Sequence, residues 1–105
     1  MSDLTEKALV KALQTELNKQ YNSNLAIDGI FGEKTKTEIP EVSFGASGNI
    51  TKILQGLLIC NGYTLNGFDG IFGSGTECAV ISYQSNQSLS IDGIAGEETF
   101  FSLCK

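Results

Sequence analysis

The chain has 105 residues and a net charge of −5 from seven basic and twelve acidic residues, and every basic residue is Lys. Without Arg, and with Lys thinly spread, it lacks the cationic stripe that nucleic acids and anionic membrane surfaces require. The chain also lacks His, which removes the commonest metal ligand and the usual general base of hydrolytic enzymes. We therefore predict no nucleic-acid partner, no membrane partner, no cofactor, no metal site and no catalytic residues.

The first predicted element is a helix that begins at a capping-box pattern, Asp3-Leu4-Thr5-Glu6, and ends near Gln20. Its apolar side chains recur at helical spacing, so we expect them to share one buried face. These residues are Leu9, Ala12, Leu13 and Leu17.

A turn of the form Asp-Gly-Ile-x-Gly follows this helix and occurs three times, in the stretches LAIDGIFGEKT, NGFDGIFGSGT and SIDGIAGEET. The Asp side chain can accept hydrogen bonds from backbone N–H groups two residues on, and the Gly after it supplies a positive φ. We expect the Ile to point inward and the residue after it, Phe in the first two copies, to fill the core. The residues with this structural role are Asp28, Gly29, Gly32, Asp69, Gly70, Gly73, Asp92, Gly93 and Gly96.

Three functional interpretations of the turn compete with the structural one. A catalytic carboxylate pair needs two different environments, whereas the same apolar context surrounds Asp28, Asp69 and Asp92. Calcium binding needs side-chain oxygens at alternating positions, and Ile-Phe-Gly supplies none. A phosphate-binding loop needs a preceding strand and a Lys, and neither is present. We therefore interpret the motif as a rigid corner between helices.

The later elements are predicted from the same signals. A short helix ends before Pro40, and a Gly- and Ser-rich connector leads to a long helix that we expect Asn49 to cap and Gly62 to end. The apolar residues of that helix are Ile50, Ile53, Leu54, Leu57 and Leu58. A capping box at Ser74 opens a helix with Ala79, Val80 and Tyr83 on one face, and the last helix holds Phe100, Phe101, Leu103 and Cys104. We expect Cys60, Cys78 and Cys104 to be small buried side chains in a reducing compartment.

Residues 9–39 align with residues 50–80 without a gap, at an offset of 41. Lys11, Leu13, Gln14, Leu17, the five turn residues from Asp28 and then Thr35 recur as Lys52, Leu54, Gln55, Leu58, the five from Asp69 and Thr76. Duplication of one helix–turn–helix unit explains this agreement. We predict an all-α fold without a sustained strand, in which a partial, two-helix repeat (1–41) precedes a complete three-helix unit (42–105).

The stretch DGIFGSGTECAVISYQSNQSLSIDGIAGEETFFSL resembles the peptidoglycan-binding domain family, the PGBD-like three-helix module. The positions that fill the family's pattern in order are Leu54-Gln55, Asp69 to Thr76, Ala79-Val80, Tyr83-Gln84, Asp92 to Thr99 and Leu103. The resemblance covers residues 45–105, and it departs from the pattern in having Tyr83 for Phe and Ala95 at the second aromatic position. It implies an orthogonal three-helix bundle for this part of the chain.

The resemblance also implies a non-catalytic module that anchors a lytic enzyme, such as a phage endolysin, on bacterial peptidoglycan. Its partner would be a catalytic lysin domain in the same or another chain. The sequence begins without a signal-peptide pattern and has no apolar run long enough to span a membrane, so we expect synthesis in the cytosol and action at the wall after lysis or release. The alternative is an oligomerisation or docking domain of a lysin that does not bind the wall, with which a homodimer is compatible.

Wall glycans are recognised by neutral hydrogen-bonding groups and by aromatic side chains on which sugar faces stack. Trp is absent, so Tyr and exposed Phe are the aromatic side chains available. We expect contacts near the loop NGYTLNG and the polar stretch YQSNQS. The candidate ligand contacts are Asn61, Tyr63, Asn66, Gln84, Asn86 and Gln87.

Overall fold

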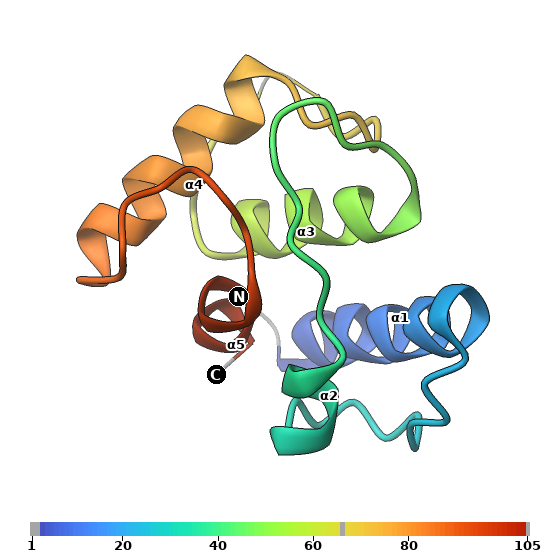
Figure 1. Ribbon diagram of the computed structural model, residues 1–105. Coiled ribbons are helices and arrows are strands. Elements are labelled where there is room, and N and C mark those ends of the chain that lie inside the picture. Colours follow the sequence, from blue (N-terminus) through green and yellow to red (C-terminus); the bar gives the residue numbers. More distant parts are fainter. Residues whose placement is uncertain (1–2, 66, 105) are drawn as a thin grey trace.

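The computed structural model describes residues 3–65 and 67–104, with side chains from residue 7 onward. The helices along the chain are α1 (Asp3–Tyr21), α2 (Glu33–Thr37), α3 (Asn49–Cys60), α4 (Ser74–Asn86) and α5 (Glu97–Leu103). Figure 1 shows α1 and α3 one below the other and running in opposite directions, with α2 beneath α1. The described residues form no strand beyond two isolated bridges, so the predicted all-α class is confirmed.

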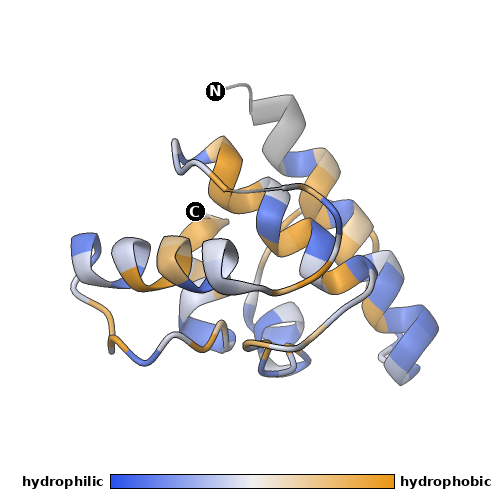
Figure 2. Cartoon of the chain, turned by 90° about the horizontal axis from the view of Figure 1, so that it is seen from above, coloured by the Kyte–Doolittle hydropathy of each residue, from blue (hydrophilic) through white to orange (hydrophobic). Residues whose placement is uncertain are grey.

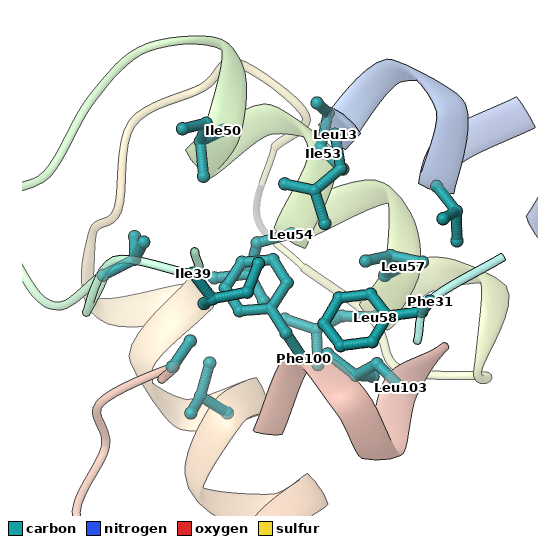
Figure 3. Close-up of a cluster of buried hydrophobic side chains, with 14 of the residues drawn as sticks. Leu13, Phe31, Ile39, Ile50, Ile53, Leu54, Leu57, Leu58, Phe100 and Leu103 are labelled. Carbon is teal, nitrogen blue, oxygen red and sulfur yellow. The ribbon is translucent and has the colours of Figure 1, made fainter. Parts of the chain in front are cut away.

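α3 is the central helix, because α1, α4 and α5 all pack against it. Its five predicted apolar positions are all buried, and Leu54, Leu57 and Leu58 have no exposed surface. Burying each such Leu contributes about 1.5–3 kcal/mol. Figure 3 shows these leucines together with Phe31, which follows α1, and Phe100 from α5. Residues from both ends of the chain therefore share one core.

α1 buries a face that differs in part from the predicted one. Leu13 and Leu17 are fully buried as expected, and Val10 is buried beside them. Leu9 is only half-buried and Ala12 is exposed, so the prediction is wrong for Ala12. The reason is that α1 rests mainly on one neighbour, α3, and turns the side that carries Val10, Leu13 and Leu17 toward the core. Figure 2 shows that the last turns of α1 are mainly hydrophilic.

The connector between α2 and α3 is held by backbone hydrogen bonds to the two later turns. Val42 and Ala95 exchange a pair of N–H to carbonyl bonds of 2.9 and 2.8 Å. The Phe72 N–H donates to the Ala46 carbonyl at 2.8 Å, and the Gly48 N–H donates to the carbonyl of the Gly after Asp69 at 2.9 Å. The connector thus fixes where the second and third Asp-Gly turns lie relative to each other.

The helix ends confirm one sequence signal and contradict two. Gly48 and Gly73 are the N-cap residues of α3 and α4, and neither helix has a side-chain cap hydrogen bond. Asn49 and Ser74 are first helical residues instead of caps, so both predicted caps are wrong. Gly62, at φ 93°, follows the end of α3 in the left-handed conformation that was predicted.

α4 buries the predicted apolar face and exposes a cysteine. Ala79, Val80 and Tyr83 are buried, whereas Cys78 lies on the exposed side of the helix. Cys60 at the end of α3 and Cys104 after α5 are half-buried. The expectation of three buried cysteines is therefore wrong, because Cys78 lies on the exposed side of α4 and Cys60 and Cys104 lie at helix ends that are partly open to solvent.

α2 ties the N-terminal part of the chain to α5. Lys36 Nζ lies 3.0 Å from Glu98 Oε1 and 4.9 Å from the centre of the Phe101 ring. The hydrogen bond to Glu98 raises the pKa of Lys36. The same ring packs on Phe31 with centroids 5.8 Å apart. Apolar and charged contacts thus join these two short helices.

None of the described helices is both long enough and apolar enough to cross a membrane.

Candidate functional site

A buried Gln reaches into each of the three Asp-Gly turns. We call residues 28–32, 69–73 and 92–96 turn 1, turn 2 and turn 3. Gln14 on α1, Gln55 on α3 and Gln84 on α4 are each 1% exposed. A buried amide must find hydrogen-bond partners. The partners of these three Gln side chains therefore show what structural role the turns have.

Turn 2 shows the arrangement. Gln55 Nε2 donates to Asp69 Oδ1 at 3.3 Å, to the Ile71 carbonyl at 3.0 Å and to Thr76 Oγ1 at 3.0 Å. Gln55 Oε1 accepts the Gly70 N–H at 2.9 Å. Asp69 Oδ1 also accepts the Ile71 N–H at 3.0 Å, which closes the turn. One amide therefore holds a helix, a turn and the start of the next helix together.

The same bonds form at the other two turns, with lengths between 2.9 and 3.1 Å. The corresponding residues are Gln14, Asp28, Gly29, Ile30 and Thr35 at turn 1 and Gln84, Asp92, Gly93, Ile94 and Thr99 at turn 3. The Gln lies 14 residues before the Asp at turns 1 and 2 and 8 residues before it at turn 3. The geometry is conserved within the chain although this spacing is not.

Local hydrogen bonds stabilise the anionic form of the carboxylates of turns 1 and 2. The Ile30 N–H, followed by the Gln14 amide, lowers the pKa of Asp28. The Ile71 N–H and the Gln55 amide lower the pKa of Asp69 in the same way. A general acid would need a raised carboxyl pKa, so these environments favour a turn-forming carboxylate over an acid catalyst.

The two glycines of the motif have different backbone requirements. The first, Gly29, Gly70 or Gly93, has φ between 72 and 77°, where a side chain is strained. The second is the N-cap of the next helix, with φ −107° at Gly73, and a Cβ there would meet no atom within 4 Å. Backbone geometry therefore requires Gly at the first position and does not require it at the second.

The Ile of turns 1 and 2 points outward, which contradicts the prediction. Ile30 is 66% exposed and Ile71 is 57% exposed, whereas the next residue, Phe31 or Phe72, is buried. The reason is that the Ile backbone faces inward, with its N–H bonded to the Asp and its carbonyl bonded to the Gln. Turns 1 and 2 therefore fill the core with the aromatic residue and present an aliphatic side chain to solvent, whereas turn 3 buries Ala95 and leaves Ile94 half-buried.

Four of the predicted ligand contacts lie at or just beyond the ends of α3 and α4. Asn86 Nδ2 donates to the Tyr63 hydroxyl at 2.8 Å, and Gln87 is the exposed C-cap of α4. Asn61 Nδ2 donates to the Leu57 carbonyl at 2.7 Å, so its amide is partly used by the scaffold. The structure thus joins Tyr63 to Asn86 directly and places uncharged polar groups around them. Their contact with a ligand stays a prediction.

The other two predicted contacts do not contribute to this surface. The Gln84 amide forms hydrogen bonds to turn 3, and the side chain has almost no exposed area. Gln84 therefore stabilises the fold, and the prediction that it contacts a ligand is wrong. Asn66 lies outside the described residues.

A groove between α1 and α3 was not predicted. It has a volume of about 310 Å³ and lies beside the loop that leads into turn 2. Six of the residues that line it are Leu9, Ala12, Glu16, Lys52, Ile53 and Phe68. The half-exposed Phe68 was the available signal, because an aromatic side chain directly before the turn is visible in the sequence. Its position next to α1 depends on how α1 packs, which local patterns do not give.

Comparison with known proteins places this architecture in a family. Residues 47–103, more than half of the chain, match the peptidoglycan binding domain family. The chain belongs to the peptidoglycan-binding domain family. This domain is a non-catalytic binding module. The match includes α3, α4, α5 and turns 2 and 3, whereas α1, turn 1 and α2 precede it.

Two solved structures have the same fold over about three fifths of the chain. The SleB N-terminal domain is 38% identical to the chain with a TM-score of 0.59, over 61% of this chain and 88% of that one. The Burkholderia AP3 phage endolysin is also 38% identical with a TM-score of 0.59, over 61% of this chain and 24% of that one.

Curated relatives are much longer proteins. An uncharacterized protein of Bacillus subtilis, FadG, is 36% identical over 94% of this chain and 17% of its own length. The N-acetylmuramoyl-L-alanine amidase CwlM of Mycobacterium tuberculosis is 37% identical over 80% of this chain and 24% of its own length. The chain thus corresponds to a quarter or less of these relatives. Among the described residues of this peptidoglycan-binding domain, no group of three or more Cys, Asp or Glu side chains could hold a metal ion.

Proposed function

We propose that this chain binds bacterial peptidoglycan and holds a lytic enzyme at the cell wall. The observation that carries the proposal is membership of the peptidoglycan-binding domain family over α3 to α5. Relatives named as an endolysin, an amidase and a spore cortex-lytic enzyme support a catalytic lysin domain as its partner, in the same chain or another. The chain itself contributes binding and no hydrolysis.

The proposed contact surface lies around Tyr63 and Asn86, with Asn61 and Gln87 beside them. Tyr63 is half-buried, packs edge-on against Tyr83 with centroids 5.6 Å apart, and keeps its hydroxyl at the surface. An anchored aromatic ring with neighbouring amides suits a sugar, whose flat face stacks while its hydroxyls exchange hydrogen bonds. The affinity of one such site is modest, and repetition along the polymer raises retention.

We also propose that residues 1–41 are a partial copy of the unit formed by residues 42–105. The equivalent Gln14 and Gln55 networks support this division, since they use the same bonds at positions 41 residues apart. The partial copy is built into the common core, so we expect it to fold with the rest of the chain.

Co-sedimentation with purified cell walls tests the proposal. We expect the chain to pellet saturably with walls, before and after removal of their secondary polymers, and to stay in solution with cellulose of equal surface area. Turbidity of the wall suspension should stay constant, because the proposed role of the chain is binding without hydrolysis. A chain that stays in the supernatant at every wall concentration would refute wall binding, and clearing of the suspension would refute a purely binding role.

A docking or oligomerisation domain is the second candidate. Exposed aliphatic and aromatic side chains favour it, with Ile30 66%, Phe44 62% and Ile71 57% exposed. Sedimentation velocity over a hundredfold concentration range separates the two functions. A dimer that is not retained by walls would support the second candidate, whereas a monomer that walls retain would support the first.

A further inference from the structure

The α1/α3 groove has an apolar floor that is partly exposed to solvent. Ala12 and Phe68 are exposed there, beside the half-buried Leu9 and the edge of Ile53. Leu9, Ala12 and Glu16 lie on one face of α1, since they are three and four residues apart. The volume of about 310 Å³ is at the lower limit of sites that bind small molecules.

A glycine on α3 shapes one wall of the groove. A Cβ at Gly56 would lie 3.2 Å from Leu9 Cδ2 and 3.5 Å from Phe68 Cε1. The absence of a side chain at Gly56 therefore lets both the Phe68 ring and Leu9 approach α3 closely. Thr15 occupies the equivalent position of the first copy, so this feature belongs to α3 alone.

The rim of the groove carries one charge of each sign. Lys52 Nζ lies 5.1 Å from the centre of the Phe68 ring, and Glu16 Oε1 accepts a hydrogen bond from Gln20 at 2.8 Å. Among the residues that the structure describes, neither of these charged side chains forms an ion pair. A ligand with a carboxylate and an ammonium group separated by a short alkyl segment would complement both charges.

We propose that the α1/α3 groove binds the stem peptide of the wall polymer, with its alkyl side chains on the floor, a carboxylate at Lys52 and an ammonium group at Glu16. This inference rests on the proposed function, because it names the part of peptidoglycan that this groove recognises. A sugar ring fits less well on this floor, since Leu9, Ala12 and Ile53 offer no partners to its hydroxyls and the uncharged polar residues that line the groove are only Thr15 and Asn49. Alanine methyls and the alkyl chain of a diamino acid need no such partners.

The site is shared between the two parts of the chain. α1 supplies Leu9, Ala12 and Glu16, and the later unit supplies Lys52, Ile53 and Phe68. The partial N-terminal copy therefore has a binding role that the complete unit alone does not provide.

NMR titration of the whole ¹⁵N-labelled chain tests the assignment, with a soluble stem tetrapeptide (alanine, glutamate, a diamino acid, alanine) as one probe and chitotetraose as the other. We expect the tetrapeptide to shift the amide signals of Ala12, Lys52, Ile53 and Phe68 saturably, while chitotetraose leaves them unchanged. Lys52→Met keeps the alkyl stem and should weaken tetrapeptide binding about fivefold. Lys34→Met, an exposed change on α2 that does not line the groove, is the matched control and should leave binding unchanged.

Ala12→Met fills the groove from an exposed helical position, so it should block the tetrapeptide without lowering the melting temperature. Absence of shifts with the tetrapeptide, or shifts of the same residues with chitotetraose, would overturn the peptide assignment. Shifts of these residues on concentrating the chain alone would overturn it in favour of a second copy. Wall pelleting is scored separately: a chain that pellets but ignores the tetrapeptide loses only this inference, whereas a chain that does not pellet loses the proposed function.

Discussion

Replacing Gln55 by Met removes the hydrogen bonds of turn 2 while keeping the volume of the side chain. Gln55 is 1% exposed, and its amide contacts the turn and the first turn of α4. Its two N–H groups and its oxygen make about three effective hydrogen bonds, because one N–H is shared between acceptors. At about 1 kcal/mol each, the substitution should lower the free energy of unfolding by about 3 kcal/mol.

Urea unfolding followed by helical circular dichroism measures this loss. A loss of 3 kcal/mol corresponds to a fall in melting temperature of more than about 10 °C for a domain of this size. Gln20→Met is the matched control, since Gln20 is exposed on α1 and bonds only to Glu16 among the described residues. The control should stay within about 0.5 kcal/mol of the parent chain. A Gln55→Met chain that loses less than about 1 kcal/mol would refute the idea that the amide holds the turn.

Three further predictions follow from the turns and the surface. Gly70→Ala should lower the free energy of unfolding in urea by about 1–2 kcal/mol, because φ is +77° and the new Cβ would lie 3.0 Å from the Gly48 carbonyl oxygen. Gly73→Ala should leave the free energy of unfolding unchanged, and equal losses for the two substitutions would contradict this prediction. The folded-state pKa values of Asp28 and Asp69 lie below 3.8, so their stabilisation is present above about pH 4 and is lost as the pH falls through the lowered values. The double substitution Asp28→Asn and Asp69→Asn should therefore reduce the fall of the urea unfolding midpoint between pH 6 and pH 2. An unaltered pH dependence of the midpoint would disprove this. Tyr63→Phe should reduce retention on walls at an unchanged melting temperature, and unaltered retention would remove its hydroxyl from the site.

Local signals in the sequence were sufficient for the helices and for the conformation of the turns. The apolar spacing of α3 predicts its buried face, and the Asp-Gly dipeptide predicts the positive φ at Gly70. The outward side chain of Ile71 could not be predicted in this way, because its direction depends on a Gln55 bond to the Ile71 carbonyl from 16 residues away. A Gln precedes each Asp-Gly turn in the sequence. This recurrence identifies the Gln as the hydrogen-bond partner of the turn only once the helices are placed.

The candidate site, too, could be predicted from the sequence only in part. Polar residues near the ends of α3 and α4 could be found from composition, and the structure joins Tyr63 to Asn86. Gln84 has the same residue type as Gln87 but faces inward, a difference that follows from the position of turn 3. The α1/α3 groove depends on two helices whose contact is set by the whole core, so no local pattern predicts it.

Retention of the intact chain by peptidoglycan sacculi stripped of secondary polymers tests wall binding most directly. The chain should bind saturably at neutral pH in the presence of a metal chelator, since side chains make all of the contacts that we propose. A chain that remains in solution at every concentration of sacculi, while its helical spectrum shows it to be folded, would contradict wall binding by this domain.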